Sequence, residues 1–294
     1  MATKDYVGEN SRILDEWEER INKRTQGIGG VNMSRDGIMC KGDMIDDGAN
    51  WIRKISYEGT PRQGEIENEK WGEAPIRILI MVKDQNAGGG ETWDSSETTF
   101  RKHTADKDDC ILSRHPFNRR LSWVTYGLLN TTNEHMVELK DIEDDDKKVL
   151  DFLDNNLFAL INCKKEAGGP RCDNNILLDA MEKDGDLLLK QIQNIDPDIF
   201  VCCGSTHNGH VQDHANLALG FLETHGYSFK FMGRKDSMYD IYYDSERNKL
   251  AIDSFHPTYP RGRSHDLEFY KEAVETYYQF LQEHPDFLKS HRNK

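Results

Sequence analysis

Four short apolar runs, separated by longer stretches with helical spacing, constrain the fold of this chain most strongly. The runs occupy residues 76–82, 157–161, 198–203 and 249–253. Short apolar runs bounded by polar loops are typical of strands that are buried on both faces. Strands that alternate with helices favour a parallel sheet with helices on both sides. The sequence therefore predicts an α/β protein, specifically a three-layer α/β/α sandwich around a central four-stranded parallel sheet.

Helical patterns fill the stretches around these runs. We expect helices over residues 122–129, 147–153, 177–195, 211–225 and 265–281, a surface helix over 11–25, and a partner strand over 239–243. Before residue 76 the chain is polar and interrupted by glycines, and it becomes strand-forming from there. We therefore expect two parts, residues 1–75 as an N-terminal extension that packs on the core and residues 76–294 as the α/β domain.

The charge balance limits the classes of partner. The net charge is −14 and 31% of the residues are charged, which excludes a generally basic nucleic-acid coat. A local basic cleft stays open, because the distribution of charge makes the electrostatic footprint. No apolar run approaches the ~18 residues that span a bilayer, and the first residues lack the apolar core of a signal peptide. We expect a soluble, cytoplasmic monomer that does not engage membranes.

The six cysteines do not indicate a metal site or a disulfide framework. None of them forms the C-x-x-C spacing of a zinc ribbon. Cys202 and Cys203 lie in an apolar, strand-like run, where buried thiols are expected. The cysteine spacing thus gives no indication of a metal site.

Polar side chains follow each of the four predicted strands. In open α/β sheets the ligand site lies outside the carboxyl ends of the strands. Asp84 follows the first run, Asn162 the second, His207 the third and His256 the fourth. An acid, an amide and two histidines are therefore expected on one rim. The glycines at 88–90 follow the acid but lack the Lys-Ser/Thr ending of a P-loop.

The order of these residues resembles the uracil-DNA glycosylase superfamily, of which this chain would be a divergent member. Asp84 matches the acid that follows the first strand, and Asn162 matches the base-reading Asn that ends the second. His256-Pro257-Thr258 matches the late His-Pro-Ser motif, which a DNA-wedging loop follows. The resemblance covers about residues 76–285, and it implies that the α/β domain is glycosylase-like.

This resemblance implies an enzyme that hydrolyses the N-glycosidic bond of a flipped uracil or modified pyrimidine in DNA and leaves an abasic site. Such an enzyme takes the nucleotide out of the stack and reads its base in a pocket. The Asn162 amide offers a donor and an acceptor to a pyrimidine edge. The Asp84 carboxylate would orient water and stabilise an oxocarbenium-like sugar. His256 would stabilise the departing base. The resemblance thus implies a reaction that requires no metal and no organic cofactor.

Residues near these motifs are further candidates for the base pocket and the path of the DNA. An aromatic that follows the first motif could stack on the flipped base. Cationic and polar side chains near the rim could contact phosphates. The base-pocket candidates are Gln85, Asn86, Trp93 and Phe100. The DNA candidates are Lys164, Lys165, Arg171, His207, Tyr259, Arg261 and Arg263, with Arg119 and Arg120 in a preceding helical stretch.

The substrate is not fixed by these motifs. Gln85 and Asn86 stand where the common uracil enzymes carry Pro and often an aromatic, so a looser pocket could admit a larger base. A role in base repair or in defence against modified phage DNA follows from that departure. Plain structural roles also stay open, with Asp84 as a helix cap, Asn162 as a turn residue and His256 as a structural histidine.

Two functions of other classes stay open as well. One is a non-catalytic DNA- or protein-binding module on the same fold. The other is a small-molecule or nucleotide hydrolase. Against the latter, the sequence contains no P-loop, no G-x-G-x-x-G and no G-x-S-x-G.

Overall fold

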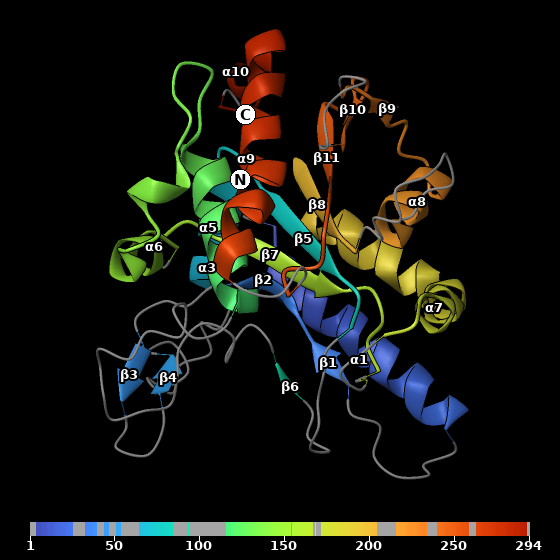
Figure 1. The fold of residues 1–294 in the computed structure, drawn as a ribbon. Coiled ribbons are helices and arrows are strands. Elements are labelled where there is room, and N and C mark those ends of the chain that lie inside the picture. The colour runs from blue at the N-terminus through green and yellow to red at the C-terminus, as the bar shows by residue number, and fades with distance from the viewer. Residues whose placement is uncertain are drawn as a thin grey trace.

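A mixed seven-stranded sheet organises the computed structural model of this α/β protein (Figure 1). The strand order is β2-β7-β5-β8-β11-β10-β9. The four central strands run parallel, whereas β2, β10 and β9 pair antiparallel at the two ends. The sheet is therefore larger than the expected four parallel strands. Its strands are β2 (Gly37–Met39), β7 (Phe158–Asn162), β5 (Ile78–Val82), β8 (Ile199–Cys203), β11 (Lys249–Ser254), β10 (Asp240–Asp244) and β9 (Lys230–Phe231).

The structure describes part of the chain. The described residues are 4–25, 33–39, 44–46, 51–53, 65–84, 93–94, 116–153, 155–166, 168, 172–204, 216–233, 240–258 and 263–292. Two small sheets pair β1 (Ser34–Arg35) with β6 (Trp93–Asp94), and β3 (Met44–Asp46) with β4 (Trp51–Arg53).

Helices pack on both faces of the large sheet. Alternate residues of each strand point to opposite faces, so each central strand contributes side chains to two apolar clusters. On β5, Ile78, Ile80 and Val82 face one apolar cluster, and Leu79 and Met81 face the other. The first cluster includes side chains of α5 (Pro116–Asn130), α6 (Asp146–Leu153), α9 (Asp266–Glu283) and α10 (Asp286–Arg292). The second includes side chains of α1 (Tyr6–Arg24), α3 (Glu65–Glu73), α7 (Asn174–Ile195) and α8 (Leu217–Thr224).

The N-terminal segment contributes to the same core as the rest of the molecule. Helix α1 lies along α7 (Figure 1) and buries Leu14, Trp17 and Ile21. These side chains join the cluster that also holds Leu79 of β5. Strand β2 extends the large sheet by pairing with β7. The described residues before and after residue 75 thus share one sheet and one core, and the expected domain boundary there stays a prediction.

Two helices begin close to the carboxyl ends of the parallel strands. Asp173 caps α7 by accepting a hydrogen bond from the backbone N–H of Asn175 at 2.8 Å. Asn216 caps α8, and its amide nitrogen also donates to the carbonyl of Cys202 at 2.7 Å and to Asp253 at 2.6 Å. These caps satisfy N–H groups that a helix start leaves open. The Asn216 side chain ties the start of α8 to the edge where the strands end, and Lys83, which follows β5, donates to Oδ1 of Asn174 at the start of α7 at 2.9 Å.

The four described cysteines are free thiols. Cys163, Cys202 and Cys203 are buried, and burial raises the pKa of the Cys163 thiol to about 12. Among the described residues, no group of three or more His, Cys, Asp or Glu side chains is arranged to hold a metal ion. Within the same residues, no helix has the length and apolar character that a membrane span requires.

Candidate functional site

Three of the predicted site residues lie at the carboxyl ends of the parallel strands of the large sheet. Asp84 follows β5, Asn162 ends β7, and His256 follows β11. Backbone pairing continues beyond the strands, since the N–H of Lys164 donates to the carbonyl of Lys83 at 2.9 Å and that of Gly204 to Ser254 at 2.9 Å. The parallel register therefore brings an acid, an amide and an imidazole to the same edge, hereafter the rim.

Asp84 is held at the rim by a lysine and by a close backbone approach. Its carboxylate lies 3.2 Å from Nζ of Lys164, and both side chains are 8% exposed. A Cβ atom at Gly168 would lie only 2.1 Å from Oδ2 of Asp84, so this position has no room for a side chain. Burial and the nearby carboxylate raise the pKa of the Cys172 thiol to about 11.

Lys164 and Lys165 do not project into solvent as phosphate contacts would require. The Lys164 ammonium faces Asp84 and also donates to the carbonyl of Glu166. Lys165 is fully buried, 2.5 Å from the equally buried carboxylate of Asp36 and over the ring of Trp17. The prediction that Lys165 binds DNA is therefore corrected, because its charge is neutralised inside the core. The ammonium of Lys164 is available to the rim rather than to the outer surface.

Asn162 is buried and its amide nitrogen is fully used. Nδ2 donates to Oδ2 of Asp36 at 3.0 Å and to Oγ of Ser34 at 3.0 Å. The backbone N–H of Asn162 donates to the same carboxylate oxygen at 2.8 Å. A primary amide has two N–H groups, so both are engaged within the protein. In this arrangement Asn162 therefore cannot donate a hydrogen bond to a base, contrary to the expectation from the sequence. Its carbonyl oxygen Oδ1 is the side-chain atom that is left to accept one.

His256 is held as a neutral ring. Its Nδ1 accepts from the backbone N–H of Thr258 at 3.3 Å and lies 2.9 Å from the Thr258 hydroxyl. An Nδ1 that accepts a backbone N–H is unprotonated, so the neutral ring carries its proton on Nε2. Burial, with a contribution from the Lys83 ammonium, lowers the pKa of His256 to about 4. Phe117 lies against the ring, with 5.8 Å between the ring centroids.

Buried charges beneath the rim support the turn that carries His256. Arg120 donates to the carbonyl of Pro257 at 3.0 Å and to Asp266 at 2.7 Å. Arg119 donates to the other carboxylate oxygen of Asp266 at 2.8 Å. Arg119 and Arg120 are thus internal groups and not phosphate contacts. Sequence reasoning missed this support, because Asp266 is distant in sequence and no local motif links it to either arginine.

A buried acid also lies under this turn. Glu272 of α9 is 6% exposed, and its oxygen Oε2 has no hydrogen-bond partner. Burial raises the pKa of Glu272 to about 8, with a further contribution from the carboxylate of Asp253. A hydrogen bond from the backbone N–H of Phe255 acts in the opposite direction. The carboxyl therefore contacts the residue that precedes His256.

Several predicted site residues cannot be placed against this rim. Trp93 belongs to strand β6, where it pairs with Ser34 of β1. Arg263 is the first residue of the 3-10 helix η3 (Arg263–His265). The side chains of these two are outside the described set. The remaining candidates lie outside the described residues altogether: Gln85, Asn86, Phe100, Arg171, His207, Tyr259 and Arg261.

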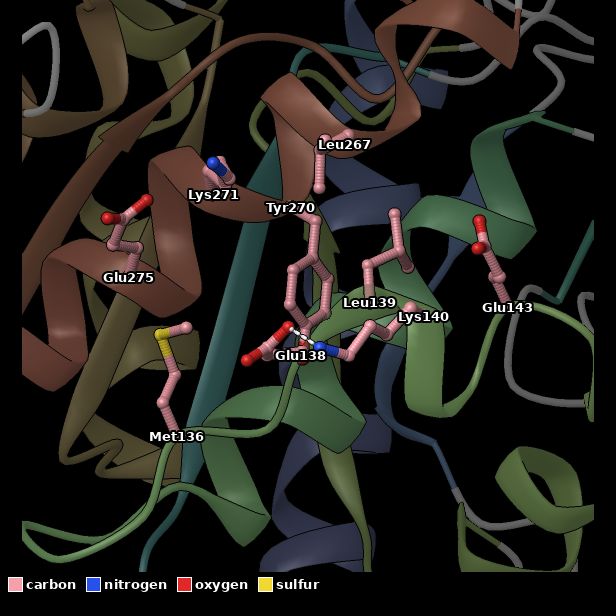
Figure 2. Close-up of a pocket in the computed structure, with 9 residues that line it drawn as sticks. All are labelled: Met136, Glu138, Leu139, Lys140, Glu143, Leu267, Tyr270, Lys271 and Glu275. Atoms are coloured by element: carbon pink, nitrogen blue, oxygen red, sulfur yellow. Dashed lines mark ion pairs between the residues drawn. The ribbon is translucent and has the colours of Figure 1, made fainter.

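A cavity among the described residues lies away from the rim. It has a volume of about 440 Å³, and Figure 2 shows Tyr270 at its centre with the Lys140–Glu138 ion pair beside it. Helix α9 and the segment around the 3-10 helix η2 (Leu139–Asp141) line this cavity. None of Asp84, Asn162 and His256 is among its lining residues. The cavity is therefore separate from the rim.

The rim combines four chemical capacities. It has a fixed carboxylate, a carbonyl acceptor, a neutral imidazole N–H and the ammonium groups of Lys83 and Lys164. Such a set can stabilise a cationic centre at one point and a developing negative charge at another. Comparison with known proteins adds no assignment, because neither a protein-family model nor a curated protein matches the sequence.

Proposed function

We propose that the rim hydrolyses the N-glycosidic bond of a flipped uracil or modified pyrimidine in DNA and leaves an abasic site. The observation that carries the proposal is the convergence of Asp84, Asn162 and His256 at the ends of parallel strands. The finer fold assignment, a three-layer sandwich of the uracil-DNA glycosylase type, is part of the proposal. It is supported by the parallel order β7-β5-β8-β11 and by helices on both faces.

The proposed chemistry assigns opposite charges to two sides of the scissile bond. As the bond between C1′ and the base nitrogen breaks, the sugar becomes oxocarbenium-like and the base leaves as an anion. The Asp84 carboxylate stabilises the cation and orients the water whose oxygen bonds to C1′. The proton that this water loses passes through solvent to the base anion, so that the products are the free base and the abasic sugar. The Nε2–H of neutral His256 donates to the base oxygen that gains negative charge. Lys83 adds positive potential beside this histidine.

The path of the DNA is assigned to those DNA candidates whose side chains lie outside the described set. Arg171, Arg261 and Arg263, with Tyr259 and His207, stay as candidates for phosphate or wedge contacts. With a net charge of −14, binding depends on such a local cluster and not on the overall field. A cytoplasmic monomer that acts in repair or in defence against modified phage DNA is part of the same proposal.

A base-release assay tests the function. Duplexes that contain uracil, hypoxanthine, oxidised pyrimidines or phage-type modified cytosines are incubated with protein, and alkali then cleaves abasic sites. We expect one class of base to be released by the wild type, and Asp84→Asn to lower the rate by at least ~100-fold, as for the loss of a group that stabilises transition-state charge. Asp179→Asn is the matched control, since this aspartate is exposed on α7 and pairs with Lys183.

The rival functions make different predictions in the same assay. A folded wild type that releases no base from any duplex would refute the glycosylase and favour a binding module. Equal rates for the wild type and Asp84→Asn would remove Asp84 from the chemistry. Stabilisation by a free nucleotide, with no response to DNA, would favour a small-molecule hydrolase.

A further inference from the structure

The orientation of the Asn162 side chain is set by a residue from the N-terminal segment. Oδ2 of Asp36 accepts from both the backbone N–H and the Nδ2 of Asn162, at 2.8 and 3.0 Å. An ionised carboxylate only accepts hydrogen bonds, so the amide must turn its nitrogen toward Asp36. Ser34 receives the second amide hydrogen at 3.0 Å. No described residue donates to Oδ1 of Asn162.

Asp36 is itself fixed from three elements. Its Oδ1 accepts from Nζ of Lys165 at 2.5 Å and from Nε2 of Gln191 on α7 at 3.0 Å. Its backbone carbonyl accepts from Nδ2 of Asn10 on α1 at 2.8 Å. The neighbouring Gly37 has φ +146°, and a Cβ there would lie 2.5 Å from that amide nitrogen. The carboxylate therefore cannot turn without breaking its contacts to Asn162 of β7, Lys165 and Gln191 of α7.

We infer that Asp36 is a positioning residue that makes Asn162 an acceptor-only reader of the base. This inference rests on the proposed function, because it assigns base selectivity to the same rim. A freely turning amide could present either its oxygen or its nitrogen to a ligand. Because Asp36 and Ser34 accept both amide hydrogens, Oδ1 is the polar atom of the Asn162 side chain that is left for a ligand. The selected base is one that offers an N–H group at this point, and a ring-nitrogen lone pair placed there is rejected.

The buried ion pair between Lys165 and Asp36 fixes the orientation of Asn162 on which this base selectivity depends. Lys165 and Asp36 are both fully buried, so each needs the charge of the other. In Asp36→Asn the backbone N–H of Asn162 still needs an acceptor at position 36, but one carboxylate oxygen becomes a donor and the charge that holds the Asn162 nitrogen is gone. The variant is therefore expected to let Asn162 present either its oxygen or its nitrogen to the ligand, which weakens the selection.

The test is a selectivity measurement on a charge-balanced variant. In Asp36→Asn/Lys165→Met both buried charges are removed together, and circular dichroism and thermal unfolding establish that the variant is folded. Ser34→Ala is the matched control, because it removes one acceptor of Asn162 but keeps the carboxylate that sets the orientation. Each protein is assayed on two duplexes, one with a uracil and one with a cytosine as the target base, both with the same 5-substituent. At N3 the uracil offers an N–H group, whereas the cytosine offers a lone pair.

We expect the double variant to shift the kcat/KM ratio of the two bases by roughly tenfold or more, as for one unpaired buried polar group. Ser34→Ala should keep the wild-type ratio, even where its kcat falls. A folded double variant that releases base with the wild-type ratio would overturn the role of Asp36 and leave the proposed function standing.

A second measurement needs neither activity nor a variant that folds. In the wild type, we expect both side-chain amide protons of Asn162 to exchange slowly with solvent in NMR spectra, because both are bonded inside the protein. Rapid exchange of these protons would refute the fixed orientation. Slow exchange in a protein that releases no base would uphold the orientation by Asp36 and refute the glycosylase proposal and the base selectivity that rests on it.

Discussion

At the residue scale, the burial of His256 predicts how base release depends on pH. The pKa of this histidine is about 4, so its ring is neutral from about pH 5 to 8 and donates from Nε2. As the pH falls through 4, Nδ1 gains a proton and can no longer accept the Thr258 N–H. We therefore expect no loss of kcat from this group above pH 5. If the rate instead changed with a midpoint near pH 6.5, and if His256→Gln removed that change, the ring would titrate as an exposed histidine does.

The burial of Glu272 predicts that the folded protein loses stability as the pH rises. Its pKa is about 8 in the folded protein and 4.5 as an ordinary carboxyl. Between these values the folded state holds one more proton, so the free energy of unfolding falls as pH rises, by up to ~1.4 kcal/mol per pH unit. Glu272→Gln should remove that slope, which urea unfolding between pH 5 and 8 measures. Glu283→Gln, at an exposed position of the same helix, should leave the slope unchanged.

The sequence predicted where the candidate side chains lie better than it predicted which residues they contact. Asp84, Asn162 and His256 do lie at strand ends, because position along a parallel strand is a local property. The engagement of both Asn162 amide protons was not foreseen, since Asp36 is 126 residues away. Lys165 was misassigned for the same reason. A lysine near a strand end is normally solvated, and only the tertiary contact with Asp36 shows that it is buried.

At the element scale, the packing of α5 against α9 depends on one glycine. A Cβ atom at Gly127 would lie 2.5 Å from Oη of Tyr270 and 2.7 Å from Cγ2 of Val274. We expect Gly127→Ala to lower the free energy of unfolding by ~1–3 kcal/mol, the usual cost of overpacking. Thermal unfolding measures the effect. Gly185→Ala is the control, because its closest contact is a Phe221 ring atom at 3.1 Å, and no loss at Gly127 would show that the helices separate easily.

The apolar runs predicted the central strands closely, and the short elements were missed. The run at 76–82 contains β5, and the expected partner strand at 239–243 corresponds to β10, which pairs antiparallel with β11. Strand β2 has only three residues, one of them glycine, so its pattern is too short to recognise. Its place in the sheet comes from pairing with β7, which is a tertiary contact.

At the scale of the whole molecule, the shared core predicts that residues 76–294 do not fold alone. Without α1, the cluster loses Leu14, Trp17 and Ile21, each worth ~1.5–3 kcal/mol when buried. That sum is comparable with the ~5–15 kcal/mol by which a whole protein is stable. A chain that starts at Ile76 should therefore lack a cooperative thermal transition, whereas one that starts at Lys4 should retain it. Cooperative unfolding of the shorter chain would show that the N-terminal segment is an independent addition.

Hydrolysis of a base–sugar bond at the rim, as proposed here, is best tested by base release in water enriched in oxygen-18, with both products identified by mass spectrometry. We expect equal amounts of free base and abasic DNA, the label at C1′ of the sugar and none in the base, and loss of both products in Asp84→Asn. Absence of free base with every DNA tested, or the same yield from wild type and Asp84→Asn, would contradict it.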